Sequence, residues 1–366
     1  MDYGGASAMK AVVGGDKIPL AFFKACSIAP QSYFEDRSTS MHGIQPAFGH
    51  LSPGQRSSGD ITADRRADYA RMLSESGDHA AAAELMEQAL ELAPAWVAGW
   101  FLLGEYRAKA DLIETAADAY RQVLALDPED IFAAGLKLVL IGAQAMPEKP
   151  PSRYVAALFD DYADRFDTAL LDKLDYRVPK KLAAMISRIG GADRRYRRAV
   201  DFGCGTGLLG IELRPWVEHL EGYDLSSAML AKAREKQIYD DLAVADLSLD
   251  ADACGLFGPA KGEGRGRADL VTAADVLMYL GALSGVFGLA ADLLERGGYF
   301  AFSVEKQLGE ESFSLAQSLR YQHSEAYVVC ELEAKGFTLL ESQQEIIRMD
   351  GGKPIQGILF IAAKTG

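Results

Sequence analysis

A short glycine-rich segment is the part of this sequence best suited to hold a small molecule. A strand-like run at 199–202 leads directly into it, and the segment contains Gly203, Cys204, Gly205 and Gly207. Glycines lack the side chains that keep a ligand away from the main chain, and the amides that open the next helix point toward such a ligand. Taken alone the segment is ambiguous, because 205–210 also fits the G-x-G-x-x-G pattern of dinucleotide-binding proteins.

Three aspartates at predicted strand ends add to this pattern. Asp201 lies within the strand that precedes the glycines, where a buried carboxylate is expected to need amide or ammonium partners. Asp224 follows the second strand-like run and suits the ribose hydroxyls of either class of cofactor, although it also fits a strand-end or helix-capping role. Asp246 follows the third run and is placed to accept a hydrogen bond from an exocyclic amine, or to be a solvated turn residue.

The elements that must position these residues alternate between strand and helix. Strand-like runs at 199–202, 220–224, 242–245, 268–273 and 298–304 are separated by helical stretches, which predicts βαβ units and a parallel sheet. Two further runs, at 337–347 and 355–363, are joined by a turn-forming segment and predict an antiparallel hairpin. A sheet that closes in this way lacks the second βαβαβ half of a dinucleotide-binding fold.

The segment from 61 to 146 has a different pattern, helical and rich in Ala, Leu and Glu. Its two units end at Pro94 and Pro128, 34 residues apart. The second unit resembles a tetratricopeptide repeat closely and the first more weakly; the matching residues of the second are Trp100, Leu103, Gly104, Ala116, Tyr120 and Pro128. The resemblance implies a groove for a protein or peptide partner. A helical hairpin that packs on its neighbour without a ligand is the alternative.

From 152 to 366 the motif string resembles the class I S-adenosylmethionine-dependent methyltransferases. The resemblance implies a Rossmann-like α/β sheet, mostly parallel with an antiparallel C-terminal hairpin, that follows an all-α repeat domain. It also implies that S-adenosylmethionine is the cofactor. The residues implied to bind it are Asp201 with Gly203, Cys204, Gly205 and Gly207 at the methionine half, Asp224 and Leu225 at the ribose, Asp246 and Leu247 at the adenine, and Ala274 or Asp275 at the sulfonium.

An aromatic segment at 159–167 looks like the entry helix of small-molecule and carrier-protein methyltransferases of this class. This likeness implies that Tyr162 and Phe166 cover the cofactor. Both residues also fit a plain role as aromatic residues in the core of a helix. More loosely, the whole arrangement is similar to methyltransferases that carry tetratricopeptide repeats.

Methyl transfer from a sulfonium requires mainly that the reacting atoms be aligned in a dry pocket. A general base is needed when the acceptor must lose a proton early. The candidates above the carboxyl ends of strands four and five are Asp275, Tyr279 and His323, with Glu305 and Tyr321 as further candidates. His323 also fits a helix-capping or packing role. No His, Asp or Glu cluster shows metal-ligand spacing, so no metal is predicted.

Composition limits the partners and the compartment. The 366 residues include 38 Lys and Arg against 52 Asp and Glu, a net charge of −14, which argues against nucleic acid and anionic membranes as partners. The basic run at 194–198 has the pattern of a phosphate contact, but a solvated turn is favoured. The four cysteines are far apart and no run is long enough to span a membrane, which favours a reducing, cytoplasmic location.

Three domains and one leading function follow. Residues 1–60, of which 20 are Gly, Pro or Ser, are expected to be disordered; 61–146 form the repeat domain and 152–366 the methyltransferase domain. The predicted function is methyl transfer to a protein, a carrier-bound acyl group or a small metabolite, with the repeats recruiting or orienting a partner. A non-catalytic cofactor-binding scaffold and, on 205–210 alone, an NAD-dependent oxidoreductase are the alternatives.

Overall fold

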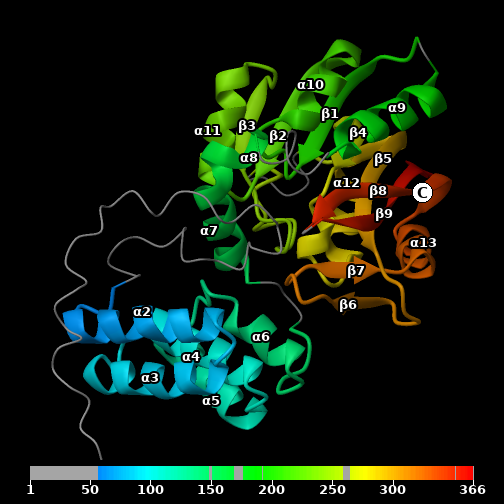
Figure 1. Ribbon diagram of the computed structural model, residues 1–366. Coiled ribbons are helices and arrows are strands. Elements are labelled where there is room, and N and C mark those ends of the chain that lie inside the picture. The colour runs from blue at the N-terminus through cyan, green and yellow to red at the C-terminus, as the bar shows by residue number, and fades with distance from the viewer. Residues whose placement is uncertain are drawn as a thin grey trace, which may run out of the picture. The chain divides into compact units, whose positions relative to one another are not determined.

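The computed structural model describes residues 57–147, 151–168, 176–191, 193–258, 264–350 and 352–365 (Figure 1). Of the segment expected to be disordered, residues 1–56 lie outside this described part. No helix of the described part combines the length and the apolar character that a membrane crossing requires.

Consecutive helices form the segment from 61 to 140. They are α2 (Ile61–Glu75), α3 (His79–Leu92), α4 (Val97–Lys109), α5 (Ile113–Leu126) and the shorter α6 (Ala134–Leu140). Short turns connect them, so that α2 packs against α3 and α4 against α5 (Figure 1). The first helix begins where the Asp60 carboxylate accepts hydrogen bonds from the N–H groups of Thr62 and Ala63. The expected helical hairpins are therefore present.

The close approach of α4 and α5 depends on one small residue. A Cβ atom at Gly104 would lie 2.5 Å from the ring of Tyr120, which is buried between the two helices. The Tyr120 hydroxyl donates a hydrogen bond of 2.6 Å to Glu105, and Lys137 pairs with the same carboxylate at 2.9 Å. The missing side chain at 104 therefore lets the two helices meet beside Tyr120.

The second part of the chain is built on a mostly parallel sheet. Its strands are β1 (Tyr196–Phe202), β2 (Val217–Asp224), β3 (Asp241–Val244), β4 (Ala268–Ala273), β5 (Leu294–Lys306), β6 (Phe313–Leu315), β7 (Tyr321–His323), β8 (Phe337–Asp350) and β9 (Lys353–Lys364). The first five are parallel in the order β3-β2-β1-β4-β5. Strand β9 pairs antiparallel with β5 and with β8. The predicted sheet and closing hairpin are confirmed.

Strands β6 and β7 were not predicted. They pair antiparallel with each other, and β7 continues the sheet beyond the end of β4, where Gln322 and His323 pair with the last residues of β5. Both strands have only three residues, which is too short for an alternating pattern to stand out in the sequence. This small addition lies at the carboxyl edge of the sheet.

Side chains alternate between two cores on the faces of the sheet. Val200 and Phe302 join one core, while Ala199 and Ala301 join the other, as the two-residue period of a strand requires. Helices α12 (Ser284–Leu293) and α13 (Glu325–Ala334) contribute to the first core, and α9 (Val178–Gly190) and α10 (Leu208–Leu213) to the second. The remaining helices α7 (Ser152–Tyr162), α8 (Phe166–Thr168) and α11 (Ser227–Lys236) complete this part.

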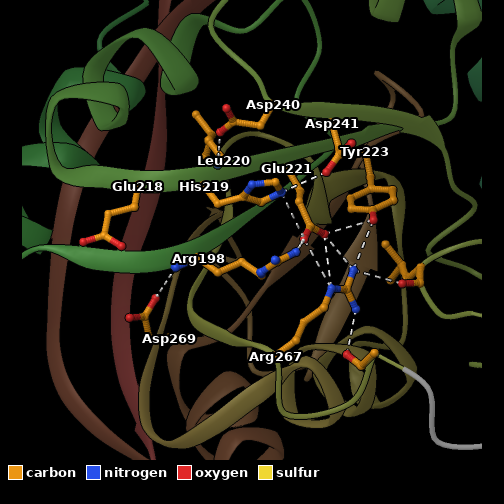
Figure 2. A network of polar contacts seen from close by, with 12 residues as sticks. Arg198, Glu218, His219, Leu220, Glu221, Tyr223, Asp240, Asp241, Arg267 and Asp269 are labelled. Atoms are coloured by element: carbon orange, nitrogen blue, oxygen red, sulfur yellow. Dashed lines mark hydrogen bonds and ion pairs between the residues drawn. The ribbon is translucent and has the colours of Figure 1, made fainter.

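A buried carboxylate connects three strands (Figure 2). Glu221 on β2 accepts hydrogen bonds from Arg198 on β1, from Arg267 at 2.8 Å and from the Tyr223 hydroxyl at 3.0 Å. Its side chain is only 3% exposed, so these donors replace the water that the charge has lost. Arg267 lies directly before β4, so the network links β1 and β2 to the start of β4.

The same carboxylate lies near a histidine and a second acid. Atoms of His219, Glu221 and Asp241 lie within 4.8 Å of one another, a spacing that could suit a metal ion. However, the two guanidinium groups that already pair with Glu221 place positive charge beside any cation bound there. The cluster therefore forms an ion-pair network.

Glu221→Gln is expected to lower the free energy of unfolding at pH 7 by about 1–3 kcal/mol. Burial raises the pKa of Glu221, but the hydrogen bonds and charges of Arg267 and Arg198 outweigh it, so the pKa lies below its ordinary 4.5. A carboxylate with a lowered pKa stabilises the fold above the pKa of the unfolded chain, and the effect is lost as the pH falls. Urea titrations should therefore show that the difference in the free energy of unfolding between wild type and variant decreases from pH 7 to pH 3.5.

The matched control for this experiment is Glu341→Gln, which removes an ion pair with the exposed Arg188. Such a surface pair contributes less than about 0.5 kcal/mol. A Glu221→Gln variant that is as stable as the control variant, or whose deficit is the same at pH 3.5 as at pH 7, would contradict the role given to Glu221.

Candidate functional site

A cavity opens at the carboxyl edge of the parallel sheet. The ends of β1, β2 and β4 and the segment after β3 all contribute to its wall. Most residues proposed from the sequence to bind a cofactor or an acceptor line this one cavity: Asp201, Gly203, Cys204, Gly205, Asp224, Leu225, Asp246, Leu247, Ala274, Asp275 and Tyr279. Residues that are far apart in the sequence therefore meet where parallel strands end.

The glycine turn forms the wall of the cavity next to β1. Gly203, Gly205 and Gly207 have φ values of +58°, +55° and +92°, a region that residues with side chains seldom adopt. A Cβ atom at Gly203 would lie 2.3 Å from a methyl group of Val276, so the close packing of the turn also requires glycine. Gly207 begins α10 and does not line the cavity.

Asp224 connects the end of β2 to the glycine turn. Its carboxylate accepts hydrogen bonds of 2.8 Å from the N–H of Gly205 and of 2.8 Å from the N–H of Ser226. Burial, opposed by these hydrogen bonds, raises the pKa of Asp224 to about 6. The helix that follows is capped by Ser226, whose Oγ accepts from the N–H of Met229, so α11 has its own cap without Asp224.

Asp201 is held by two hydroxyl groups. Tyr239 and Thr272 each donate to its carboxylate at 2.7 Å, and the residue is almost fully buried. Burial raises the pKa of Asp201 to about 6, although the two hydrogen bonds lower it. The partners of this buried aspartate are therefore hydroxyl groups of β4 and of the segment before β3, rather than the amide or ammonium groups expected from the sequence.

Asp246 and Leu247 line the cavity after β3. The Asp246 carboxylate accepts from the N–H of Ser248 at 2.9 Å and from its hydroxyl at 2.6 Å. Ser248 in turn lies 3.1 Å from the hydroxyl of Ser152 at the start of α7. These hydrogen bonds hold the Asp246 carboxylate in a local turn at the cavity wall.

Helices α7 and α8, with the short turn at 163–165 between them, cover the cavity with aromatic side chains. Phe159 and Phe166 line the cavity, whereas Tyr162 does not line it and instead stacks edge-on against Phe166 at 5.6 Å between ring centres. Asp167 bonds to Thr206 in the glycine turn and pairs with Lys236 at 2.6 Å. The sequence predicts that Tyr162 and Phe166 cover the cavity. Phe159, rather than Tyr162, lines it together with Phe166.

Asp275 and Tyr279 lie at the end of the cavity beyond β4. Asp275 has a φ of +58° and is held by a hydrogen bond of 2.9 Å from its own N–H to Ser303 Oγ. Burial raises the pKa of the Asp275 carboxyl despite the nearby Arg348. The Tyr279 ring packs edge-on against Phe159, with 5.2 Å between ring centres.

His323 is not brought to the cavity. The side chain is fully buried, does not line the cavity, and its Nε2 lies 3.0 Å and 2.9 Å from the carbonyl oxygens of Leu280 and Gly281. Burial lowers the pKa of His323 to about 4, which keeps the ring neutral at pH 7. The packing role that the sequence also allowed fits this placement, and Ser324 rather than His323 caps α13.

Two arginines at the cavity wall were missed by the sequence analysis. Arg320 precedes β7 and Arg348 lies near the end of β8, and both line the cavity although they are almost fully buried. Glu305, proposed as a possible base, does not line the cavity and pairs with Arg348 behind it. Arg320 lies three residues before His323 in the sequence, whereas nothing in the sequence around Arg348 points to a site.

Residues 174–339 match a family model described as a methyltransferase domain. This match covers the glycine turn, the three aspartates and the strands that carry them. The chain contains a methyltransferase domain.

Several solved structures are similar to this chain. Magnesium protoporphyrin IX methyltransferase from Synechocystis is 18% identical over 57% of this chain and 84% of its own, with a TM-score of 0.39. An S-adenosylmethionine-dependent methyltransferase from Clostridium acetobutylicum is 17% identical over 57% and 99%, with a TM-score of 0.41. Another from Mesorhizobium loti is 20% identical over 50% and 96%, with a TM-score of 0.37. A search of curated proteins finds no match.

The glycine turn leaves the wall of the cavity open to a small molecule. A Cβ atom added at Gly205 would have Phe166 as its nearest neighbour, at 3.8 Å. The space beside the Gly205 backbone is therefore open. The cavity is thus open at the point where the main chain is exposed. Carboxylates of Asp224 and Asp246 supply acceptors at the same wall for hydroxyl and amine donors.

Asp201→Asn is expected to remove part of the pH dependence of stability of the methyltransferase domain. The pKa of Asp201 is about 6 in the fold against an ordinary 3.8, so between pH 4 and 6 the folded state holds a proton that the unfolded state releases. This group therefore favours folding less as the pH rises through that range, by at most about 1.4 kcal/mol per pH unit. Urea titrations at pH 4.5, 5.5, 6.5 and 7.5 measure the difference from wild type.

The free energy of unfolding of Asp201→Asn should increase relative to that of the wild type as the pH rises. Asp224→Asn should behave in the same way, because the pKa of Asp224 is also about 6. A difference between wild type and Asp201→Asn that stays constant from pH 4.5 to 7.5 would show that Asp201 has an ordinary pKa in the fold.

Proposed function

We propose that this chain transfers the methyl group of S-adenosylmethionine to an acceptor that is a protein, a carrier-bound acyl group or a small metabolite. The observation that supports it is the single cavity in which the glycine turn, Asp224, Asp246 and Asp275 meet. In this proposal the methionine half lies at 203–207, the ribose hydroxyls bind Asp224 beside Leu225, and the adenine lies beside Asp246 and Leu247. Ala274 and Asp275 then face the sulfonium.

The donor supplies an electrophilic methyl group on sulfur, which is already activated for transfer. The protein must therefore mainly align the acceptor atom and exclude water. Phe159 and Phe166 line the cavity from α7 and α8 and shield it from solvent. The bonds of Asp167 to Thr206 and Lys236 hold this cover on the glycine turn and on α11.

Asp275 is the side chain best placed to accept a proton from the acceptor. It lines the cavity, and burial raises its pKa, which makes the carboxylate a stronger base than an exposed aspartate. In the proposed reaction the acceptor O–H, N–H or C–H proton passes to the Asp275 carboxylate as the methyl group arrives. Tyr279 is the second candidate at this end of the cavity.

Asp224→Ala is expected to weaken the binding of S-adenosylhomocysteine at least tenfold, because it removes the acceptor for the ribose and the partner of the Gly205 N–H. Isothermal titration of the full chain measures the affinity. Turnover is followed with isotopically labelled donor in a cell extract, and the labelled species is expected to be lost in the variant.

The control is Asp241→Asn, an exposed aspartate at the opposite end of the neighbouring β3, which should bind S-adenosylhomocysteine within twofold of wild type. Equal affinity of wild type and Asp224→Ala, or a labelled species that persists undiminished in Asp224→Ala, would contradict the assigned site. Wild type that binds S-adenosylhomocysteine without labelling any species would favour the non-catalytic scaffold.

We infer further that the helices from 61 to 140 are tetratricopeptide repeats that recruit or orient a protein or peptide partner. The spacing of 34 residues between Pro94 and Pro128 and the two helical hairpins support this inference. Helix α2 also exposes two large side chains, Tyr69 at 63% and Met72 at 60%. Large exposed apolar side chains at neighbouring positions are typical of surfaces that bind a partner.

The double variant Tyr69→Ala and Met72→Ala should reduce the labelling of a protein or carrier-bound acceptor in a cell extract at least fivefold and leave the affinity for S-adenosylhomocysteine unchanged. The matched control is Leu92→Ala, which removes another exposed apolar side chain from α3. Labelling that remains at the wild-type level in the double variant would argue against a recruiting role for α2.

A further inference from the structure

Two Phe-Asp pairs lie seven residues apart in the segment that covers the cavity. They are Phe159 with Asp160 and Phe166 with Asp167. Seven residues make about two helical turns, which places both pairs on one side of a helical segment. Both phenylalanines line the cavity, whereas neither aspartate does. Each aspartate instead bonds to another element that borders the cavity.

Asp160 binds the start of α11, the helix that lies beside α7 (Figure 1). Its Oδ1 accepts hydrogen bonds from the Ser226 hydroxyl at 2.6 Å and from the N–H of Ala228 at 3.2 Å. Ser226 is fully buried, and its own N–H donates to Asp224. Ser226 therefore connects the cover to the carboxylate that takes the ribose in the proposed function.

Asp167 binds the glycine turn. Its Oδ1 accepts a hydrogen bond from the hydroxyl of Thr206, which is almost fully buried and directly follows Gly205. Its Oδ2 accepts a hydrogen bond of 2.6 Å from Lys236 Nζ on α11. Phe166, the neighbour of Asp167, is also the residue nearest to a Cβ atom added at Gly205. The aspartate and the ring beside it thus meet the same turn.

A third acid of this segment makes a weaker contact. Asp164 pairs with Lys232 at 2.9 Å, but its side chain is 85% exposed, and such surface pairs contribute little. Loss of Asp160 or Asp167, in contrast, would remove the acceptor of a buried hydroxyl group. The anchors of the cover are therefore Asp160 and Asp167, and Asp164 supplies a matched control.

We propose that Asp160 and Asp167 hold the two phenylalanines closed over the bound nucleoside, which enters and leaves only when these anchors release. Both aspartates are then positioning residues, because they act through the rings beside them and do not line the cavity. The proposal rests on the methyl-transfer function given above, in which the nucleoside is S-adenosylmethionine or its product.

The two anchors attach at different parts of the cofactor site. Asp160 acts beside the carboxylate assigned to the ribose, and Asp167 acts on the turn assigned to the methionine half. A nucleoside that occupies both parts lies against both rings, because Phe159 and Phe166 line the same cavity. The opening of such covers limits ligand exchange in many enzymes. The anchors are therefore expected to set the rate at which the nucleoside dissociates.

The dissociation of S-adenosylhomocysteine from the full chain, followed by surface plasmon resonance, tests the proposal. Asp160→Ala and Asp167→Ala should each increase the dissociation rate constant at least fivefold without slowing association. A cover that opens more often speeds release and does not impede entry, whereas a distorted binding site also slows productive binding. Dissociation within twofold of wild type in the folded alanine variants, or association slowed at least fivefold, would overturn the proposal.

Matched variants separate the two anchors from the charge of the segment. Asp164→Ala removes the same charge and should leave dissociation within twofold of wild type. Asp160→Asn and Asp167→Asn keep an oxygen that accepts from the Ser226 and Thr206 hydroxyls, so each should dissociate more slowly than its alanine counterpart. An Asp164→Ala variant as fast as the other alanine variants, or asparagine variants as fast as the alanine variants, would overturn the role of the anchors.

Hydrogen exchange of the full chain supplies a readout that needs no nucleoside. In Asp160→Ala the backbone amides of 152–168 should exchange at least fivefold faster, while those of β1 and β4 keep the wild-type rate. Asp160 is exposed on α7, so this variant tests one anchor even where Asp167→Ala does not fold. Unchanged exchange at 152–168 would show that the cover is not released, and faster exchange throughout the sheet would show a general loss of stability; either result would overturn the proposal.

The outcome also separates this inference from the function on which it rests. A wild-type chain that does not bind S-adenosylhomocysteine overturns the methyl-transfer proposal. A chain that binds S-adenosylhomocysteine, but whose folded alanine variants release it at the wild-type rate, overturns only the role of Asp160 and Asp167.

Discussion

One turn of the main chain determines the site. Between β1 and α10 the backbone takes left-handed conformations at Gly203, Gly205 and Gly207, which brings bare amides to the carboxyl edge of the sheet. The N–H of Gly205 donates to Asp224 at the end of β2, so the turn and the neighbouring strand fix each other. A side chain at Gly203 would collide with Val276. Any change that moves this turn therefore moves the cavity wall.

Charged side chains around the cavity are held in two ways. Near the glycine turn, Asp201 and Asp224 are held by hydroxyl and backbone donors and have raised pKa values. Beside Asp275, Arg320 and Arg348 are held by carboxylates. Carboxylates at the wall supply acceptors for hydroxyl and amine donors.

Local sequence signals were sufficient for one half of this site. Gly203 and Asp224 could be predicted because each follows a recognisable strand, and parallel strands end at one edge. The parallel sheet followed from the alternation of strand-like and helical runs, and the closing hairpin from two strand-like runs joined by a turn segment. The aromatic cover was predicted as a segment, but which rings face inward depends on the rotation of α7, and Phe159 rather than Tyr162 lines the cavity.

The other half depends on contacts between distant segments. Arg348 lies in β8, a strand with two register shifts, and no local pattern marks the side of the strand that faces the cavity. Arg320 enters through the short β6–β7 addition, which the sequence did not reveal. His323, singled out for its rarity, is buried against the carbonyls of Leu280 and Gly281. Residue type alone could not distinguish a catalytic histidine from a packed one.

The most direct measurement is a crystal structure of the full chain grown with S-adenosylhomocysteine. Electron density for the nucleoside should lie against Gly203 and Gly205, with the ribose hydroxyls on the Asp224 carboxylate and the adenine beside Asp246. Density elsewhere on the protein, or an Asp224 carboxylate turned away from a nucleoside that does occupy the cavity, would contradict the account of this site.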